Sequence, residues 1–217
     1  MPNRAPELSW EEPPQARPSL TRAEIVQTAL KAADRDGLSA VSIRRVAAML
    51  GVRPMTLYSR VASKADLIDL MINEVVAEVL VPEPLPADWR EALRAIARQA
   101  HSAYARHPWI ITASGASQRV APNTMLQAEQ LLSALAPLQL TPQDAWAVAA
   151  LLNDYTLGHA QRLLSESGVR ARQYPDLDPA TFPHLARALP EGDRRRGQES
   201  FETGLGTVID GIAHRYG

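Results

Sequence analysis

Cysteine is absent from the 217 residues of this chain. Its absence excludes disulfide bonds, thiolate zinc sites and cysteine nucleophiles. Long apolar runs are missing too, and no stretch approaches the roughly 18 uninterrupted apolar residues of a membrane-spanning helix. The first 20 residues contain no apolar core of signal-peptide length. We therefore expect a soluble, cytoplasmic protein that has no membrane partner.

Neither sign of charge dominates the composition. The chain has 23 Lys and Arg residues against 24 Asp and Glu residues, which gives a formal net charge of −1. This balance argues against a chain that coats nucleic acid with basic residues throughout, but it allows a local basic patch. Apolar residues make up 46% of the chain, which is enough for a substantial core.

The short motifs of common enzyme classes are also missing. The sequence contains no G-x-S-x-G, no H-E-x-x-H, no P-loop and no G-x-G-x-x-G that opens a helix. No serine, histidine and acid set stands out. We therefore predict that the protein is not an enzyme, has no catalytic residues and no metal site, and needs no cofactor beyond a small-molecule effector.

Hydrophobic periodicity predicts helices along the chain, and no segment shows the alternation of a β-strand. Local signals mark the helix starts: Thr21 and Glu24 form a capping box, and Ser42, Ser63, Asp88 and Thr141 are N-cap residues. A glycine at 37 is expected to end the first helix in a left-handed conformation. We predict an all-α fold with helices near 22–36, 43–50, 54–61, 64–80, 89–107, 109–113, 122–136, 142–166, 182–189 and 193–216.

The segment from 42 to 64 is the most informative part of the sequence. Two short predicted helices are joined by a turn at Gly51-Val52, and Leu57 and Val61 form the inner face of the second. The segment has no acidic residue and five basic ones, Arg44, Arg45, Arg53, Arg60 and Lys64. A helix of this kind fits the major groove, and cations beside it fix the register on phosphates. A helical hairpin with ordinary solvated arginines is the alternative interpretation.

Residues 20–80 resemble the DNA-binding domain of the TetR family of repressors. The shared pattern consists of Arg44-x-Val46-Ala47, Leu50-Gly51-Val52, Thr56-Leu57-Tyr58 and Lys64-x-x-Leu67. The resemblance implies DNA contacts from Ser42, Arg44, Arg53, Pro54, Met55, Thr56, Tyr58, Arg60 and Lys64. Arg53 and Ser59-Arg60 depart from the residues frequent in the family, so no base preference follows from it.

The remainder of the chain resembles the ligand-binding domain of the same family, in its tetracycline-repressor class. The similar patterns are Trp89-Arg90-x-Ala92-Leu93, His107-Pro108-Trp109 and Phe201-x-x-Gly204-Leu205. The resemblance implies a homodimer, with a four-helix interface formed by residues 142–166 and 193–216. Small residues would let these helices approach closely, namely Ala145, Ala149, Gly158, Ala160, Gly204 and Gly211. Ile209 and Ile212 would fill the seam, unless these helices pack only within one chain.

The expected ligand cavity is mostly apolar with a few polar groups. Polar and aromatic residues that interrupt apolar helix faces are candidates for its lining: His101, Tyr104, His107, Trp109, Trp146, Asn153, Tyr155 and His159. Each of them taken singly also fits an ordinary packed residue of a helical core.

These observations predict three parts: a flexible, proline-rich arm (1–20), a three-helix helix-turn-helix domain (21–66), and a larger ligand-binding and dimerisation domain (67–217). We predict a homodimeric transcriptional repressor on a palindromic double-stranded operator, whose half-sites lie about 34 Å apart. A small-molecule inducer would release it through the fourth helix. The alternatives are an activator with the same fold, or a helical ligand-binding or interaction module without DNA activity.

Overall fold

A computed structural model describes residues 20–113, 119–168, 178–188 and 198–217. Within these ranges the chain is helical and has no β-strand, which confirms the predicted all-α class. The elements are α1 (Arg22–Asp36), η1 (Leu38–Ala40), α2 (Ile43–Met49), α3 (Pro54–Tyr58), α4 (Lys64–Val79), α5 (Trp89–Arg106), α6 (Ile110–Ala113), α7 (Pro122–Leu135), η2 (Ala136–Leu138), α8 (Pro142–Gly168), α9 (Pro183–Ala188) and α10 (Gln198–Tyr216). Nearly all of the predicted proline-rich arm lies outside the described residues.

The helix starts follow the predicted caps. The backbone amide of Thr21 donates to Oε2 of Glu24 at 2.7 Å, and Thr21 Oγ1 accepts from the Glu24 amide at 3.2 Å, which completes the capping box. Ser42 and Ser63 each accept from the amide three residues later. Gly37 differs from the prediction: its φ of 81° is positive but its ψ of 166° is extended, because the chain leads directly into η1.

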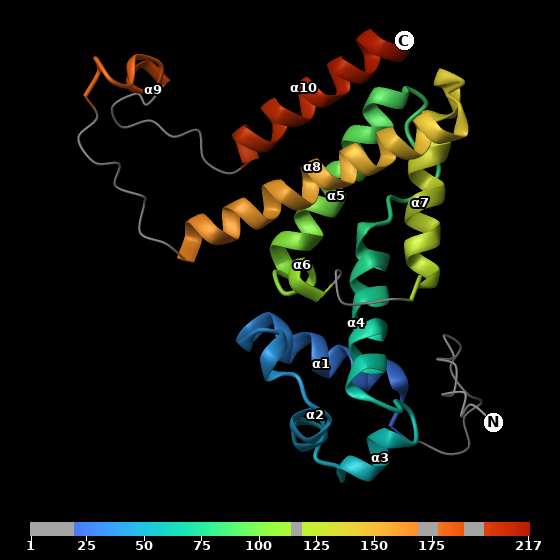
Figure 1. Ribbon diagram of the computed structural model, residues 1–217. Helices are drawn as coiled ribbons and strands as arrows, with labels where there is room; N and C mark the ends of the chain where they lie inside the picture. Colours follow the sequence, from blue (N-terminus) through green and yellow to red (C-terminus); the bar gives the residue numbers. More distant parts are fainter. Residues whose placement is uncertain (1–19, 114–118, 169–177, 189–197) are drawn as a thin grey trace, which may run out of the picture.

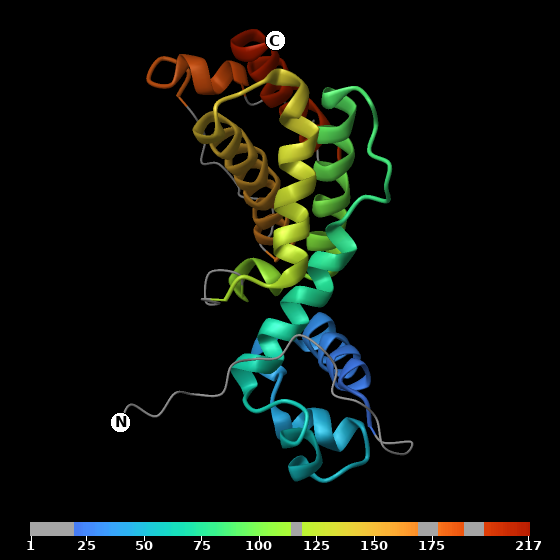
Figure 2. The ribbon, with the colours of Figure 1, turned by 90° about the vertical axis from the view of Figure 1, so that its right-hand side faces the viewer.

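The molecule has a small lower part and a larger upper bundle, which α4 joins (Figures 1 and 2). Helices α1, α2 and α3 form the lower part, and α5, α7, α8 and α10 form the bundle. One apolar cluster runs without interruption from Ile25 of α1, along α4, to Ala160 of α8. A shift of α4 therefore displaces side chains packed against it in both parts of the molecule.

Helices α8 and α10 lie antiparallel and side by side (Figure 1). The Tyr155 hydroxyl donates to the Phe201 carbonyl at 2.7 Å, and the Tyr216 hydroxyl donates to Oδ1 of Asp144 at 3.1 Å. The apolar face of α10 packs inside this chain, where Ile209 and Ile212 are buried in a core with α5, α7 and α8. The prediction that these two isoleucines fill a seam between subunits is therefore wrong.

Two alanines and one glycine expected at that seam also serve the packing of the single chain. Ala149 and Ala160 are buried in its core. Gly204 faces the Tyr155 side chain so closely that an added Cβ would overlap the hydroxyl. Gly158 and Gly211, in contrast, have no atom of the described residues within 4 Å of such a Cβ. Ala149, Ala160 and Gly204 therefore pack against their own chain, whereas Gly158 and Gly211 face open space.

Candidate DNA interface and ligand cavity

Helices α2 and α3 form a helix-turn-helix whose turn contains Gly51 at a φ of 68°. The Val52 amide donates to the Ala47 carbonyl at 3.0 Å and closes the turn. Leu57 and Val61 are buried, which fixes the inner side of α3 against the domain core. The short α3 helix is therefore held by its inner side alone, and its outer side is presented to solvent.

The outer side of α3 is unusually accessible for side chains of its size. Met55 is 75% exposed and Tyr58 is 48% exposed. Arg53, Pro54 and Thr56 are exposed beside them. Large apolar and aromatic groups left in water beside hydrogen-bonding groups are typical of a surface that binds a partner.

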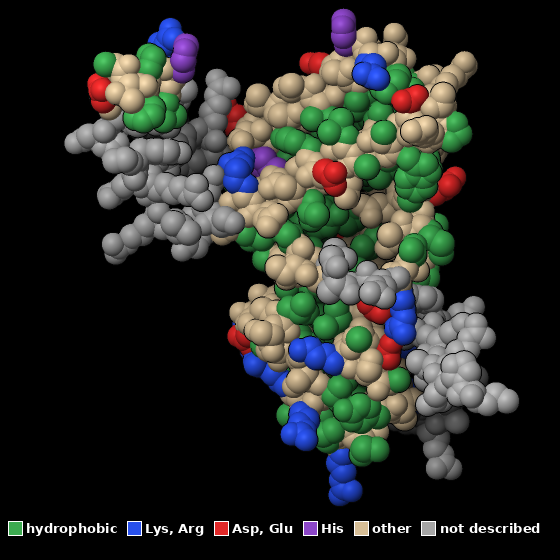
Figure 3. Space-filling view, in the orientation of Figure 1, with side chains coloured by type: hydrophobic (Ala, Val, Ile, Leu, Met, Phe, Trp, Pro, Cys, Tyr) green, Lys and Arg blue, Asp and Glu red, His purple; other side chains and the backbone are tan. Residues whose placement is uncertain are grey.

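The cations of this surface differ in what they contact within the chain. Arg45 pairs with Asp36 at the end of α1, so the acid missing from the segment 42–64 is supplied from an earlier helix. Arg44, Arg53 and Lys64 are exposed and form no ion pair with the described part of the chain. Figure 3 shows Lys and Arg side chains gathered over the lower part of the molecule. Three cations are thus available to an external anion.

The remaining predicted DNA contacts have local roles as well. Ser42 caps α2, and its Oγ accepts from the Arg45 amide at 3.2 Å. Arg60 is half-buried directly after α3, and its amide donates to the Leu57 carbonyl at 2.9 Å. Lys64 begins α4, whose cap is Ser63. The residues predicted to contact DNA thus lie on or directly beside α2 and α3 and at the first residue of α4.

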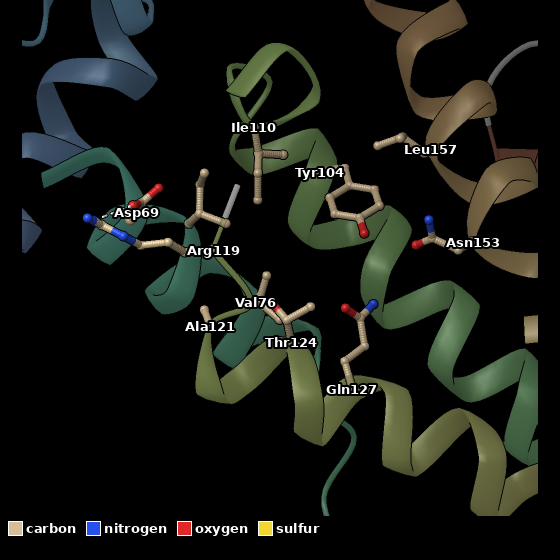
Figure 4. Close-up of a pocket in the computed structure, with 11 residues that line it drawn as sticks. Asp69, Val76, Tyr104, Ile110, Arg119, Ala121, Thr124, Gln127, Asn153 and Leu157 are labelled. Atoms are coloured by element: carbon tan, nitrogen blue, oxygen red, sulfur yellow. Dashed lines mark hydrogen bonds and ion pairs between the residues drawn. The ribbon is translucent and has the colours of Figure 1, made fainter. Parts of the chain in front are cut away.

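A cavity of about 210 Å³ lies inside the upper part, between α4, α5, α7 and α8 (Figure 4). Apolar side chains form much of its wall: Ile72, Val76, Ile110, Ala121 and Leu157. Its polar groups gather at two ends. An apolar wall with a few polar groups is typical of sites that bind small organic molecules.

One end of the cavity carries amide and hydroxyl groups. Tyr104, Gln127 and Asn153 point toward one another there, from α5, α7 and α8 (Figure 4). Burial raises the pKa of the Tyr104 hydroxyl, and its hydrogen bond with Gln127 acts in the opposite direction. The hydroxyl therefore stays neutral at physiological pH. This end offers uncharged donors and acceptors.

The other end of the cavity is ionic. Arg119 Nη1 contacts Oδ1 of Asp66 at 2.5 Å and Oδ2 of Asp69 at 3.2 Å. Both carboxylates lie on the first turns of α4 and are only 8% exposed, whereas Arg119 comes from the segment before α7 and is more accessible. Asp69 and Arg119 line the cavity.

Of the eight residues predicted to line a ligand site, Tyr104 and Asn153 line this cavity. His101, Tyr155 and His159 instead form an aromatic cluster around Phe201 of α10. His101 Nε2 lies 3.0 Å from His159 Nδ1, and the His101 ring stacks on Phe201 with centroids 4.0 Å apart. This cluster fills the space between α5, α8 and α10.

His107 and Trp109 belong to a third group, where the upper bundle meets α1. Oδ1 of Asp34 lies 2.7 Å from His107 Nδ1 and accepts from Trp109 Nε1 at 2.8 Å. His107 Nε2 faces Glu78 of α4 at 3.3 Å. Trp146, the last of the eight, is 56% exposed on α8. These residues are therefore spread over four places rather than one site.

Sequence reasoning missed nine residues of the cavity wall, namely Asp69, Ile72, Val76, Ile110, Arg119, Ala121, Thr124, Gln127 and Leu157. A usable signal exists for one of them. Asp66 and Asp69 interrupt the apolar face that Leu67, Leu70 and Met71 give to α4. An acid inside an apolar helix face needs a partner or a ligand, because an unpaired buried charge is costly.

Comparison with known proteins decides the family. Residues 81–216 match the family model described as the tetracycline repressor-like C-terminal domain. The chain belongs to the TetR family. Members of this family are transcriptional regulators, so the predicted function, a ligand-responsive TetR-family repressor, agrees with these relatives. No described helix combines the length and the apolarity needed to cross a membrane.

Individual relatives are similar over most of their length. The chain is 33% identical to the transcriptional repressor DrrR1 of Streptomyces coeruleorubidus, over 90% of this chain and 78% of DrrR1. It is similar to apo ActR of Streptomyces coelicolor with a TM-score of 0.77 and 30% identity, over 91% of this chain and 98% of that one. ActR in complex with actinorhodin aligns with a TM-score of 0.77 and 28% identity, over 93% and 99% of the two chains.

Proposed function

We propose that this TetR-family regulator is a homodimeric repressor that binds a palindromic operator and leaves it when a small molecule enters the cavity. The observation that carries the proposal is the outer side of α3, where exposed hydrogen-bonding groups stand beside cations that form no ion pair with the described part of the chain. Such a surface has no use inside the folded chain. It suits duplex DNA, because base edges and phosphates offer the complementary groups.

The proposed contacts divide by chemistry. We call α3, with its N-cap Arg53, the recognition helix. Its residues Arg53, Thr56 and Tyr58 face base edges and the flanking backbone. Arg44 and Lys64 lie on the neighbouring helices and bind phosphates, where the N-terminus of α4 adds a favourable dipole. Ser42, Pro54, Met55 and Arg60 complete the surface.

The exposed faces of α8 and α10 are proposed to form the dimer interface. Trp146 and Leu151 of α8 are 56% and 50% exposed, which places large apolar groups in water. Gly158, Gly206 and Gly211 leave open space beside both helices. Glycine within a helix costs about 1 kcal/mol relative to alanine, and close approach of a second helix would offset that cost. The α3 helix has only five residues and contacts few base pairs by itself. A dimer supplies a second copy of this helix for the second half-site.

Release by a small molecule rests on the cavity and on the relatives. The cavity is lined by parts of α4, α5, α7 and α8, so a ligand there contacts the helix that also carries the DNA-binding part. ActR, a solved relative, forms a complex with actinorhodin. A ligand that favours one position of α4 must change operator affinity by the same factor by which DNA changes ligand affinity.

Selection of DNA sites from a random duplex pool with the purified full-length protein tests the proposal. We expect a palindromic site whose half-sites are separated by about one helical turn. Tyr58→Ala and Lys64→Gln should weaken binding to it, and Lys64→Gln should also reduce the dependence on salt. Arg94→Gln is the matched control, because Arg94 pairs with Glu91 on α5, a helix of the upper bundle that lies away from α3 (Figure 1). A monomer that selects no sequence even at low salt would contradict the proposal.

A further inference from the structure

The ionic end of the cavity lies at the first turns of α4, the helix that joins the DNA-binding part to the upper bundle (Figure 1). Asp66 and Asp69 occupy the first turns of α4, and Ser63, which caps that helix, donates its hydroxyl to Oδ2 of Asp66 at 2.9 Å. Only residues 59–62 separate Ser63 from the end of α3. A change in how these carboxylates are held is therefore transmitted to the recognition helix over a very short path.

We propose that Arg119, held by Asp66 and Asp69, is the point at which the ligand acts, and that the ligand carries a negatively charged group that draws Arg119 away. We call this three-residue contact the α4 clasp. The inference rests on the proposed function and specifies both the ligand class and the coupling residue.

The charge of the ligand follows from the accessibility of the partners. Asp66 and Asp69 are fixed on a buried helix face, whereas the Arg119 side chain is 41% exposed and belongs to the short segment that leads into α7. Arg119 is thus the partner that can move. A guanidinium that leaves two carboxylates loses the attraction of two negative charges, and an anionic ligand group offsets that loss better than a neutral group does.

Binding of such a ligand and closure of the clasp exclude each other. While Arg119 stays between the two carboxylates, an incoming anion meets two negative charges and one positive charge. Once the anion takes Arg119, Asp66 and Asp69 are left buried without their cation, which is strongly unfavourable. The first turns of α4 must then shift so that water can reach these carboxylates. This mutual exclusion produces the coupling between ligand and DNA.

Two further hydrogen bonds between α4 and α7 hold these helices together when the first turns of α4 shift. One turn beyond the clasp, the Asn123 amide donates to Oδ1 of Asn73 at 3.1 Å, and Asn123 Nδ2 donates to the Asn73 carbonyl at 2.9 Å. These two neutral hydrogen bonds do not depend on Arg119. Opening the clasp therefore frees the end of α4 nearest the DNA, while α7 remains attached at Asn73.

The first test measures operator affinity without any ligand, using the duplex obtained by site selection. We expect Arg119→Gln to weaken binding on the order of tenfold, within the range of about 5–150-fold typical of allosteric coupling. Arg119→Lys should restore much of the affinity, and Arg94→Gln should bind as the wild type does. Melting temperatures of all variants establish that they are folded. Wild-type affinity in folded Arg119→Gln would overturn the proposal.

The second test uses two matched pairs of probes, 2-naphthoate with 2-naphthamide and anthraquinone-2-carboxylate with its amide. We expect the wild type to bind an acid of at least one pair more tightly than its amide, and to release the operator with it. Arg119→Gln should abolish this preference. Asp69→Asn should enlarge it while weakening operator binding, because Arg119 is then held by one carboxylate only. A role of the clasp in folding alone would not strengthen ligand binding.

The outcomes separate the two proposals. A wild-type protein that selects no duplex contradicts the proposed function itself. A wild type that binds its operator, but prefers neither acid over its amide or binds none of the four probes, overturns the assignment of an acidic ligand. Asp69→Asn with an unchanged acid preference overturns the role of the clasp in coupling.

Discussion

The DNA-binding part and the upper bundle use their charged side chains in opposite ways. Arg44, Arg53 and Lys64 face outward and form no ion pair with the described part of the chain. In the bundle, Arg119 is held between two carboxylates, and His107 lies between Asp34 and Glu78. Substitutions in the first region should therefore change affinity for a partner. Substitutions in the second should change contacts inside the fold, and with them its stability or, at Arg119, the coupling between ligand and operator.

The largest effect is expected from removing two outward cations together, as in Arg44→Gln/Arg53→Gln. Operator affinity should fall by about 100-fold or more, because a symmetric dimer loses four cations at once. If each of them contacts one phosphate, the plot of log K against log salt should become shallower by about 3.6. Fluorescence anisotropy titrations at several salt concentrations measure both quantities.

The free energy of unfolding of the same double variant tests the comparison between the two regions. Exposed side chains that form no ion pair with the described part of the chain contribute little to folding, so its free energy of unfolding should stay within about 0.5 kcal/mol of the wild type. Urea denaturation of the DNA-free protein tests this expectation. A large loss of stability would mean that these cations hold the fold, and the comparison between the regions would fail.

The contrast also explains what the sequence could predict. Helix starts at Thr21, Ser42, Ser63 and Asp88 depend on residues three or fewer positions apart, and all four caps are present. The basic segment needs no tertiary partner, so composition alone indicates it. Local patterns thus suffice for surfaces and helix ends.

Interior partners lie beyond the reach of such patterns. Arg119 lies 53 positions from Asp66, and Trp109 lies 75 positions from Asp34. Nothing in the sequence near Trp109 shows that its indole donates to α1 rather than to a ligand. Ile209 and Ile212 illustrate the same limit, because an apolar helix face looks alike whether it packs within a chain or between chains. Only tertiary packing separates these cases.

A substitution at the contact between α1 and the bundle should have the next largest effect. Asp34→Ala removes the acceptor of the buried Trp109 indole and the partner of His107, and an unsatisfied buried donor costs about 1–3 kcal/mol. Urea or thermal denaturation should show a loss of that size. Asp36→Ala on the same helix is the control. Its ion pairs with Arg35 and Arg45 are at the surface, so their removal should cost much less stability than the loss of the Asp34 contacts. Equal losses of stability in Asp34→Ala and Asp36→Ala would contradict the distinction between the buried contacts of Asp34 and the surface ion pairs of Asp36.

Two glycines of α10 should respond in opposite directions. Gly204→Ala places a methyl group against the Tyr155 hydroxyl, and overpacking of this kind costs about 1–3 kcal/mol. Gly206→Ala meets no atom within 4 Å and should raise helix stability by up to about 1 kcal/mol. Denaturation of both variants at low protein concentration measures these effects. Tyr155→Phe should lessen the Gly204→Ala penalty, and additive losses would exclude that contact as its cause.

The smallest effect should come from pH, and it should be confined to the upper bundle. All five histidines follow residue 100, so the segment 42–64 keeps its charge between pH 8 and 5. Burial lowers the pKa of His101 from its ordinary 6.5, against the opposing influence of Glu202. Below about pH 6.5 the unfolded chain therefore takes up a proton that the native state refuses, and stability falls. The loss levels off once pH drops below the native pKa.

One histidine can contribute at most about 1.4 kcal/mol of this change for each pH unit. The free energy of unfolding of His101→Gln should accordingly decline less than that of the wild type between pH 7.5 and 5. Gln keeps a polar group near His159 Nδ1, so the substitution removes the titrating ring without leaving that nitrogen against an apolar side chain. Parallel pH profiles for the two proteins would show that another group titrates in this range. The acid sensitivity would then not belong to the cluster between α5, α8 and α10.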